Sequence, residues 1–203
     1  MTMITIDQAR ALYSGADAAH SFDHILRVLA LAEHIAAAEG ADLEIVRTAT
    51  LLHDIARLEP DHQQLGAARA REILAGQPAE RVEAVCHAIE AHRFRKGPAP
   101  TTIEACCLFD ADKLDAIGAV GVARSIAYGA VHGQRIWSQP LESIDAGQPP
   151  GGDTYTPSHE FVYKLARLAD MLTTATARRI AADRHRVMVE FFHRLDLEVA
   201  GEA

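Results

Sequence analysis

The chain is poor in aromatic residues and lacks long runs of β-branched residues. Aromatics make up only 5% of its 203 residues. Alanine and leucine dominate instead, and both are strong helix formers. The composition therefore favours an all-α fold. The length fits one domain spanning 1–203, with room for a substantial core and a helical extension.

Cysteine and positive charge are also scarce. The three cysteines, Cys86, Cys106 and Cys107, lie in apolar helical stretches without metal-type spacing, so we expect buried free thiols in a reducing cytosol. We see no signal peptide and no apolar run of bilayer-spanning length, which predicts a cytoplasmic protein without a membrane partner. The net charge of −8 argues against a nucleic-acid partner. A nucleotide substrate stays compatible, because a bound divalent cation inverts the local field.

The most informative residues are two histidines and two aspartates in the order His24, His53-Asp54 and Asp112. Each lies in an otherwise apolar stretch, where an unpaired carboxylate would be expensive to bury. Helix neighbours point about 100° apart, so an ion lying over the helix can contact both His53 and Asp54. The alternative is a solvated helix face. Three coupled segments favour a metal site, and the −2 ligand charge matches a divalent ion.

Three segments carry a resemblance to a known family: 19–28, which contains the first histidine, 51–55, which contains the doublet, and 110–119. The chain resembles the HD superfamily of metal-dependent phosphohydrolases over about residues 18–125. The similarity is to small bacterial HD hydrolases, some of which are nucleotide pyrophosphohydrolases. It implies an HD-type helical bundle with additional C-terminal helices. It also implies that the metal ligands are His24, His53, Asp54 and Asp112.

Several charged residues lie beside these ligands in the sequence. Arg27 comes three positions after the first histidine, on the same helix face, and Lys113 follows the last aspartate. Both are candidates to contact substrate phosphate. Alternatively, Arg27 pairs with a structural carboxylate such as Asp115, which is itself a candidate to orient a ligand. Asp110 is about 200° away from the last ligand around the helix, which predicts a structural role.

Further histidines are candidate site residues. His92 continues an apolar stripe of its helix and is expected at the site, whereas His87 falls on a more polar side and is expected to face solvent. His62 is expected in the loop after the doublet. In some HD proteins such extra histidines bind a second metal; for His62 and His92 a phosphate-binding or proton-transfer role is the preferred alternative. His20 fits the site rim or a helix cap.

The pattern of apolar residues and breakers predicts the remaining organisation. Helices are expected over 6–14, 21–39, 43–58, 65–75, 78–93, 101–118 and 122–128. Gly40 is expected to end the second of these helices and Asp42 to cap the start of the third, and Thr101 and Glu104 match a capping box. Glycine and proline then concentrate in 129–157, which is expected to be a long loop or lid. One or two helices follow over 158–200, with a break near Thr173-Thr174, and they offer a surface for a homodimer.

The predicted chemistry is metal-assisted hydrolysis of a nucleotide, with release of phosphate or pyrophosphate. The ion is expected to be Mn²⁺, Mg²⁺ or Co²⁺, which lowers the pKa of bound water and offsets phosphate charge. Asp54 is expected to accept a proton or orient that water, and Arg27, Lys113 and His92 to stabilise the phosphate. Alternatives are a phosphodiesterase acting on a cyclic or signalling nucleotide, di-iron oxygenase chemistry, and a regulatory module with a residual metal site.

Overall fold

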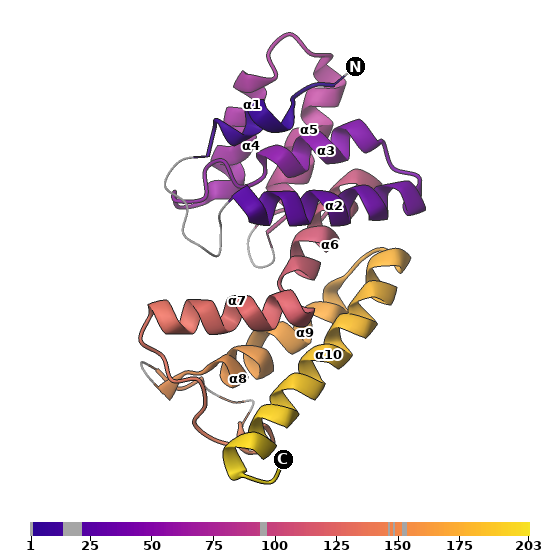
Figure 1. Cartoon of the computed structure of the whole chain (residues 1–203). Helices are drawn as coiled ribbons and strands as arrows, with labels where there is room; N and C mark the ends of the chain where they lie inside the picture. Colours follow the sequence, from indigo (N-terminus) through magenta and orange to yellow (C-terminus); the bar gives the residue numbers. More distant parts are fainter. Residues whose placement is uncertain (1, 14–21, 94–96, 146, 148, 152–153) are drawn as a thin grey trace. The chain divides into compact units, whose positions relative to one another are not determined.

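All regular secondary structure in the part of the chain that the structure describes is helical. The computed structural model (Figure 1) describes residues 2–13, 22–93, 97–145, 147, 149–151 and 154–203. Within these ranges there is no strand, which confirms the all-α prediction. The α-helices are α1 (Ile6–Arg10), α2 (Phe22–Glu39), α3 (Leu43–Leu52), α4 (His62–Ile73), α5 (Ala79–Ala91), α6 (Ile103–Asp115), α7 (Gly118–Val131), α8 (Pro157–Glu160), α9 (Ala166–Leu168) and α10 (Ala175–Ala200).

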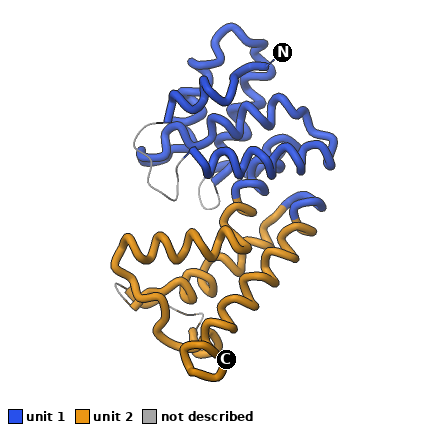
Figure 2. The backbone as a smooth tube through the Cα atoms, in the orientation of Figure 1, with its two compact units in different colours: residues 1–112, 173–177 blue, residues 113–172, 178–203 orange. Residues whose placement is uncertain are grey.

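The backbone divides into two compact units (Figure 2). The first holds residues 1–112 and 173–177, and the second holds 113–172 and 178–203. The division therefore falls inside α6 and near the start of α10. The interpretation of 1–203 as one HD-type domain remains a prediction. No single helix among the described residues is long and apolar enough to cross a bilayer. The consecutive helices α6 and α7 would be so only when taken together, by length and composition alone, and a bend of 60° separates them.

The first unit is built around α2, α3 and α5. Six fully or nearly fully buried apolar residues of α2 recur at helical spacing, so the buried face of the helix is mainly apolar. They are Ile25, Val28, Leu29, Ala32, Ile35 and Ala36. Val46 and Ala49 of α3 and Val85 and Ile89 of α5 are also fully buried. Such an apolar core excludes water from the polar side chains at its edge.

The sequence marks several helix ends correctly. Gly40 adopts φ +74°, and the N–H of Ala41 donates to the carbonyl of Ala36, which is the glycine C-cap expected after α2. Asp42 caps α3 by accepting hydrogen bonds from the N–H groups of Glu44 and Ile45.

The predicted capping box before α6 is wrong in its residues. The hydroxyl of Thr102, not of Thr101, accepts from the N–H of Ala105 at the start of α6. The carboxylate of Glu104 accepts from the N–H of Asp42 instead of closing a box. The carboxylate of Glu104 therefore bonds a residue distant in sequence, and not the backbone at the start of its own helix as a capping box requires.

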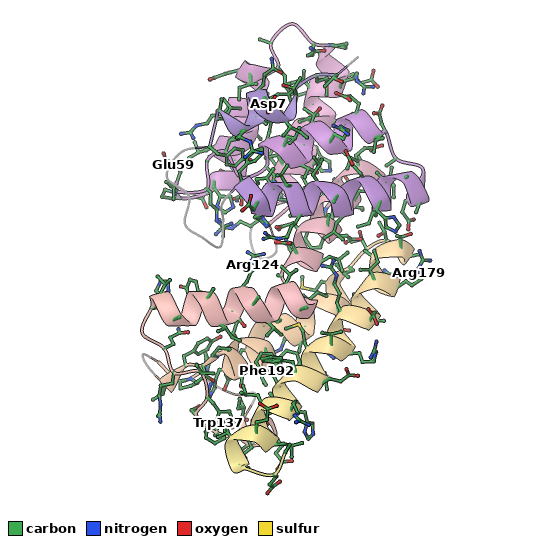
Figure 3. The ribbon with its side chains drawn as sticks, in the orientation of Figure 1. Asp7, Glu59, Arg124, Trp137, Arg179 and Phe192 are labelled. Carbon is green, nitrogen blue, oxygen red and sulfur yellow. The ribbon has the colours of Figure 1, made fainter. Side chains whose placement is uncertain are left out.

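The second unit packs α7, α8 and α9 with the long helix α10. Phe192, labelled in Figure 3, is fully buried, and its ring lies 5.0 Å from that of Phe161. Phe161 opens a π-helix that runs to Leu165, followed by α9 and the 3-10 helix Ala169–Met171.

Much of the predicted 129–157 loop has little regular structure where the structure describes it. The helix α7 extends to Val131, beyond the expected end, and Leu141–Ser143 forms a short 3-10 helix. The segment is held to α10, because Asp196 accepts hydrogen bonds of 2.7 Å from the Trp137 indole and from the Leu141 N–H. The expected break at 173–174 is confirmed, since α10 begins at Ala175.

Two predicted boundaries near the doublet are wrong. The helix expected to run to residue 58 ends at Leu52, so His53 and Asp54 follow α3 instead of lying within it. His62 is the first residue of α4 and not part of a loop. The turn between them closes at Asp61, which adopts a left-handed φ of +52° that aspartate tolerates better than most residues.

Removal of the Asp42 side chain tests how much the N-cap of α3 contributes to the stability of the protein. Asp42→Ala should lower the free energy of unfolding by about 1–2 kcal/mol, because it removes the cap and the pair with Arg81 at 2.8 Å. The hydrogen bond from Arg81 lowers the pKa of Asp42. The contribution of Asp42 to the free energy of unfolding is therefore fully present above its unfolded-state pKa, and is lost as the pH falls through its folded-state pKa.

Urea unfolding of both chains between pH 7 and pH 3 measures this difference. The gap between wild type and Asp42→Ala should narrow on acidification. Asp42→Asn, which keeps an oxygen cap, is the matched control and should lie between the two. Equal stability of wild type and Asp42→Ala at pH 7 would contradict the assigned role.

Candidate metal centre

Two sets of ligand atoms lie in the first unit. His24 of α2, His53 after α3 and Asp112 of α6 form one set, and Asp54, His62 and His92 form the other. Within each set the ligand atoms all lie within 4.8 Å of one another. The structure thus brings together all four ligands expected from the sequence, and adds the two further histidines.

Asp54, a member of the second set, also faces two histidines of the first. Its Oδ2 is 3.9 Å from His24 Nε2 and 3.7 Å from His53 Nε2. Its Oδ1 is 3.8 Å from the Nε2 atoms of both His62 and His92. Each carboxylate oxygen therefore faces two imidazole nitrogens. His24 Nε2 is also 3.5 Å from Oδ1 of Asp112, which completes the first set.

These separations fit ions better than hydrogen bonds. Distances of 3.7–3.9 Å are too long for a hydrogen bond. Two ligands of one ion, each about 2.0–2.2 Å from it, lie at most about 4.4 Å apart. His53 Nε2, Asp54 Oδ1 and His62 Nε2 are moreover buried without any hydrogen-bond partner. Unpartnered buried polar atoms are costly, and a cation in each set would satisfy all three. The residues therefore fit a divalent metal.

Backbone carbonyls fix which ring nitrogens face the site. His53 Nδ1 lies 2.8 Å from the carbonyl oxygen of Thr50, and His92 Nδ1 lies 2.5 Å from that of Ile89. A ring nitrogen that donates to a carbonyl must carry the proton, so the other nitrogen keeps its lone pair. In both histidines that other nitrogen is Nε2, which is the atom that faces Asp54.

The end of α3 places the doublet. Because α3 ends at Leu52, the chain continues in consecutive tight turns, with Ile55 N–H bonded to the Leu52 carbonyl and Arg57 N–H to the Asp54 carbonyl. The hydroxyl of Tyr13 donates to the Leu51 carbonyl at 3.0 Å. This satisfies one of the carbonyls that a helix end leaves free.

The charge balance keeps the ligands in metal-binding protonation states. Burial raises the pKa of Asp54, but the positive charges that His53 and His92 carry when protonated, together with that of Arg57, outweigh burial and lower the pKa to about 2. Burial lowers the pKa of His62 to about 4, against the opposing charge of Asp54. At neutral pH Asp54 is therefore ionised and His62 is neutral, as metal ligation requires.

Two arginines that the sequence analysis missed flank the second set. Arg57 Nη1 lies 3.7 Å from Asp54 Oδ1, and Arg93 Nη1 donates to the buried Gln63 at 3.2 Å. Both charges help to lower the pKa of His62, so both lie within electrostatic range of it. Arg57 was identifiable from its spacing of three residues after Asp54. Arg93 was not, because only the fold brings the end of α5 beside α4.

The other candidates divide between the two units. Arg27 is half-buried on α2, and Lys113 and Asp115 belong to the second unit, where both are buried. Asp115 accepts a hydrogen bond of 2.7 Å from Arg124. His87 is half-buried and pairs with Thr101, in place of the expected solvent-facing position. His20 lies outside the described residues.

Comparisons with known proteins agree with this geometry. The family model described as HD domain matches residues 21–117, a range that contains all six ligand candidates. YpgQ of Bacillus subtilis is 35% identical over 189 residues, which cover 90% of this chain and 85% of YpgQ.

Solved structures extend the similarity to nearly the whole chain. The crystal structure of Bacillus subtilis YpgQ in complex with ADP has a TM-score of 0.76 at 34% identity, covering 98% of this chain and 100% of that one. An HD-superfamily hydrolase from Bacillus thuringiensis has a TM-score of 0.73 at 29% identity, with coverage of 96% and 94%. The second unit thus has counterparts in these relatives as well.

The two ligand sets predict two ions per chain. A titration with Mn²⁺, followed by the electron paramagnetic resonance of the free ion, should give two sites in wild type. His62→Ala should remove one and Asp112→Asn should weaken the other. Asp54→Asn should weaken both, because its oxygens face both sets.

Glu59→Gln is the matched control, since this half-exposed carboxylate lies five residues from Asp54 and pairs with Arg69. It should bind Mn²⁺ as wild type does. A single ion that survives His62→Ala unchanged would show that the second set is not a metal site.

Proposed function

The chain belongs to the HD-domain family, and we propose that it is a divalent-metal-dependent phosphohydrolase that acts on a nucleotide. The observation that carries the proposal is Asp54, a buried carboxylate with two imidazole nitrogens facing each oxygen at 3.7–3.9 Å. Relatives named as HD-superfamily hydrolases support the reaction class. The ADP complex of YpgQ supports the nucleotide.

The ligand assignments are part of the proposal. His24, His53, Asp54 and Asp112 would hold one ion, and Asp54 would share a second with His62 and His92. Imidazole and carboxylate ligands suit Mn²⁺, Mg²⁺ or Co²⁺. A divalent ion bound there supplies a water of lowered pKa and offsets negative charge on the phosphate.

The protein's own residues orient the reaction. Hydrolysis adds water oxygen to phosphorus and breaks the bond to the leaving phosphate oxygen. Asp54 is ionised and buried, so it can hold that water or accept its proton. In a chain that binds only the first ion, the Nε2 atoms of His62 and His92, each 3.8 Å from Asp54 Oδ1, would instead be available to accept this proton and donate it to a phosphate oxygen. The apolar residues around the site limit entry of further water.

The cationic residues would bind the nucleotide phosphates. Arg57 lies next to Asp54, and Arg93 is held by Gln63 beside His62. Guanidinium groups bind phosphate through paired, charge-assisted hydrogen bonds. Additional phosphate contacts are proposed for Arg27, three residues after His24, and for Lys113, which follows Asp112. This arrangement favours a substrate with at least two phosphates.

A hydrolysis panel tests the proposed reaction. Ribo- and deoxyribonucleoside di- and triphosphates are incubated with the protein and Mn²⁺, and products are resolved by phosphorus NMR. We expect pyrophosphate and a monophosphate from triphosphates, with no product from Asp54→Asn. Glu59→Gln should keep full activity.

The competing functions give other outcomes in the same panel. Release of inorganic phosphate alone would replace pyrophosphate release with phosphatase chemistry. Turnover restricted to cyclic or signalling nucleotides would favour a phosphodiesterase. Full Mn²⁺ binding without turnover of any phosphoester would contradict the enzyme proposal and favour a regulatory module.

Removal of the two arginines tests the phosphate contacts. Each of Arg57→Gln and Arg93→Gln should raise KM about 10- to 100-fold, because a hydrogen bond to a charged group contributes about 1.5–3 kcal/mol. The turnover number should change less, since these contacts exist in both ground state and transition state.

Arg69→Gln is the matched control. Arg69 is a surface residue whose side chain bonds the Ile55 carbonyl, next to the doublet, and pairs with Glu59. Neither of these contacts involves one of the six candidate metal-binding residues. An unchanged KM in both Arg57→Gln and Arg93→Gln would place the phosphates elsewhere.

A further inference from the structure

The short segment Thr173–Ala177, at the start of α10, belongs to the first unit, although the residues before and after it belong to the second. It lies between the two helices that carry the pair His24 and Asp112. The segment is bonded to α6 through Asp110 and to α2 through Glu39, whose carboxylate accepts from the Thr176 N–H at 2.8 Å. We propose that this segment, acting through Asp110, positions Asp112 as a metal ligand.

Asp110 is fully buried and richly hydrogen bonded. Its Oδ1 accepts from the N–H of Thr173 at 2.9 Å, and its Oδ2 accepts from the N–H and the hydroxyl of Thr174, each at 2.7 Å. The Thr173 hydroxyl lies 3.2 Å from both oxygens. A buried carboxylate is tolerated only when its oxygens are satisfied in this way, so the segment and α6 hold each other in one arrangement.

The spacing along α6 gives these bonds their consequence. Asp110 and Asp112 are two residues apart and point about 200° apart around the helix axis. Asp110 accordingly faces Thr173 and Thr174, while Asp112 Oδ1 lies 3.5 Å from His24 Nε2. Bonds on one face of α6 therefore fix the rotation of the helix, and with it the direction of the ligand on the opposite face.

The segment is itself held firmly. The Thr174 hydroxyl accepts from the Ala177 N–H at 3.2 Å and so caps the start of α10. The same hydroxyl donates to Asp110, which makes it a link between the helix cap and the carboxylate. Glu39, the last residue of α2, accepts from the N–H of Thr176 and so holds the segment to the end of that helix. Asp110 is therefore a positioning residue for Asp112, and not a ligand.

The inference rests on the proposed metal site, so the test measures binding of Mn²⁺ alone, with no substrate. Asp110→Asn places an amide donor against N–H and hydroxyl donors, and should weaken Mn²⁺ binding at the site of Asp112 about 10- to 100-fold, as loss of a ligand-orienting partner does. Thr174→Val should do the same. Thr174→Ser, which keeps the hydroxyl, should bind Mn²⁺ as wild type does.

Asp196→Asn is the matched control for a general loss of stability. Asp196 also joins distant segments through two hydrogen bonds of 2.7 Å, but in the second unit. It should leave the Mn²⁺ affinity unchanged, and urea unfolding of each chain shows that the variants are folded at the assay temperature. If Asp110→Asn does not fold, Thr174→Val carries the test.

The outcomes separate this inference from the proposed function. If Asp112→Asn loses an ion while folded Asp110→Asn and Thr174→Val bind as wild type does, the inference is wrong and the metal site stands. An equal loss in Asp196→Asn would also overturn it. A wild-type chain that binds no Mn²⁺ overturns the metal site together with the inference.

Discussion

The structure of the first unit depends on one buried carboxylate and the imidazoles around it. Asp54 is shielded from water, and each of its oxygens faces two histidine nitrogens at distances too long for hydrogen bonds. A carboxylate in this setting needs positive charge, and Arg57 supplies only part of it. The proposed metal ion would compensate the cost of burying Asp54, which would tie local stability to the proposed chemistry.

The helices around Asp54 serve mainly to hold side chains in fixed directions. Backbone carbonyls hold the Nδ1 atoms of His53 and His92, so that their Nε2 atoms face the carboxylate. Tyr13 supports the end of α3, and Asp110 with Thr174 supports α6 from the opposite face. These contacts come from segments far apart in the chain. A preorganised site of this kind would bind the proposed metal without first reorganising the protein.

The sequence predicted the helical class and identified four residues that the structure brings together, for physical reasons. A charged residue inside an apolar stretch is a local signal, and His24, His53, Asp54 and Asp112 all show it. Helix ends with a glycine or aspartate cap, at Gly40 and Asp42, were equally readable because their hydrogen bonds are local. The boundary at Leu52 was not, since the apolar pattern of α3 continues past the point where the backbone tightens into turns. Glu104 failed as a capping residue because Asp42, distant in sequence, takes its carboxylate.

The sequence by itself determined the residue types that can hold a metal, the apolar helix faces that bury them, and the family to which they belong. Their convergence was decided only by the tertiary structure. His62 and His92 share Asp54 Oδ1 because α5 packs against both α3 and α4. Asp112 faces His24, while Asp110, on the same helix, bonds a segment 63 residues away. A local sequence pattern indicates which kind of partner a buried residue requires, such as an opposite charge or a hydrogen-bond donor. It does not indicate which distant residue provides that partner, because this depends on how the helices pack.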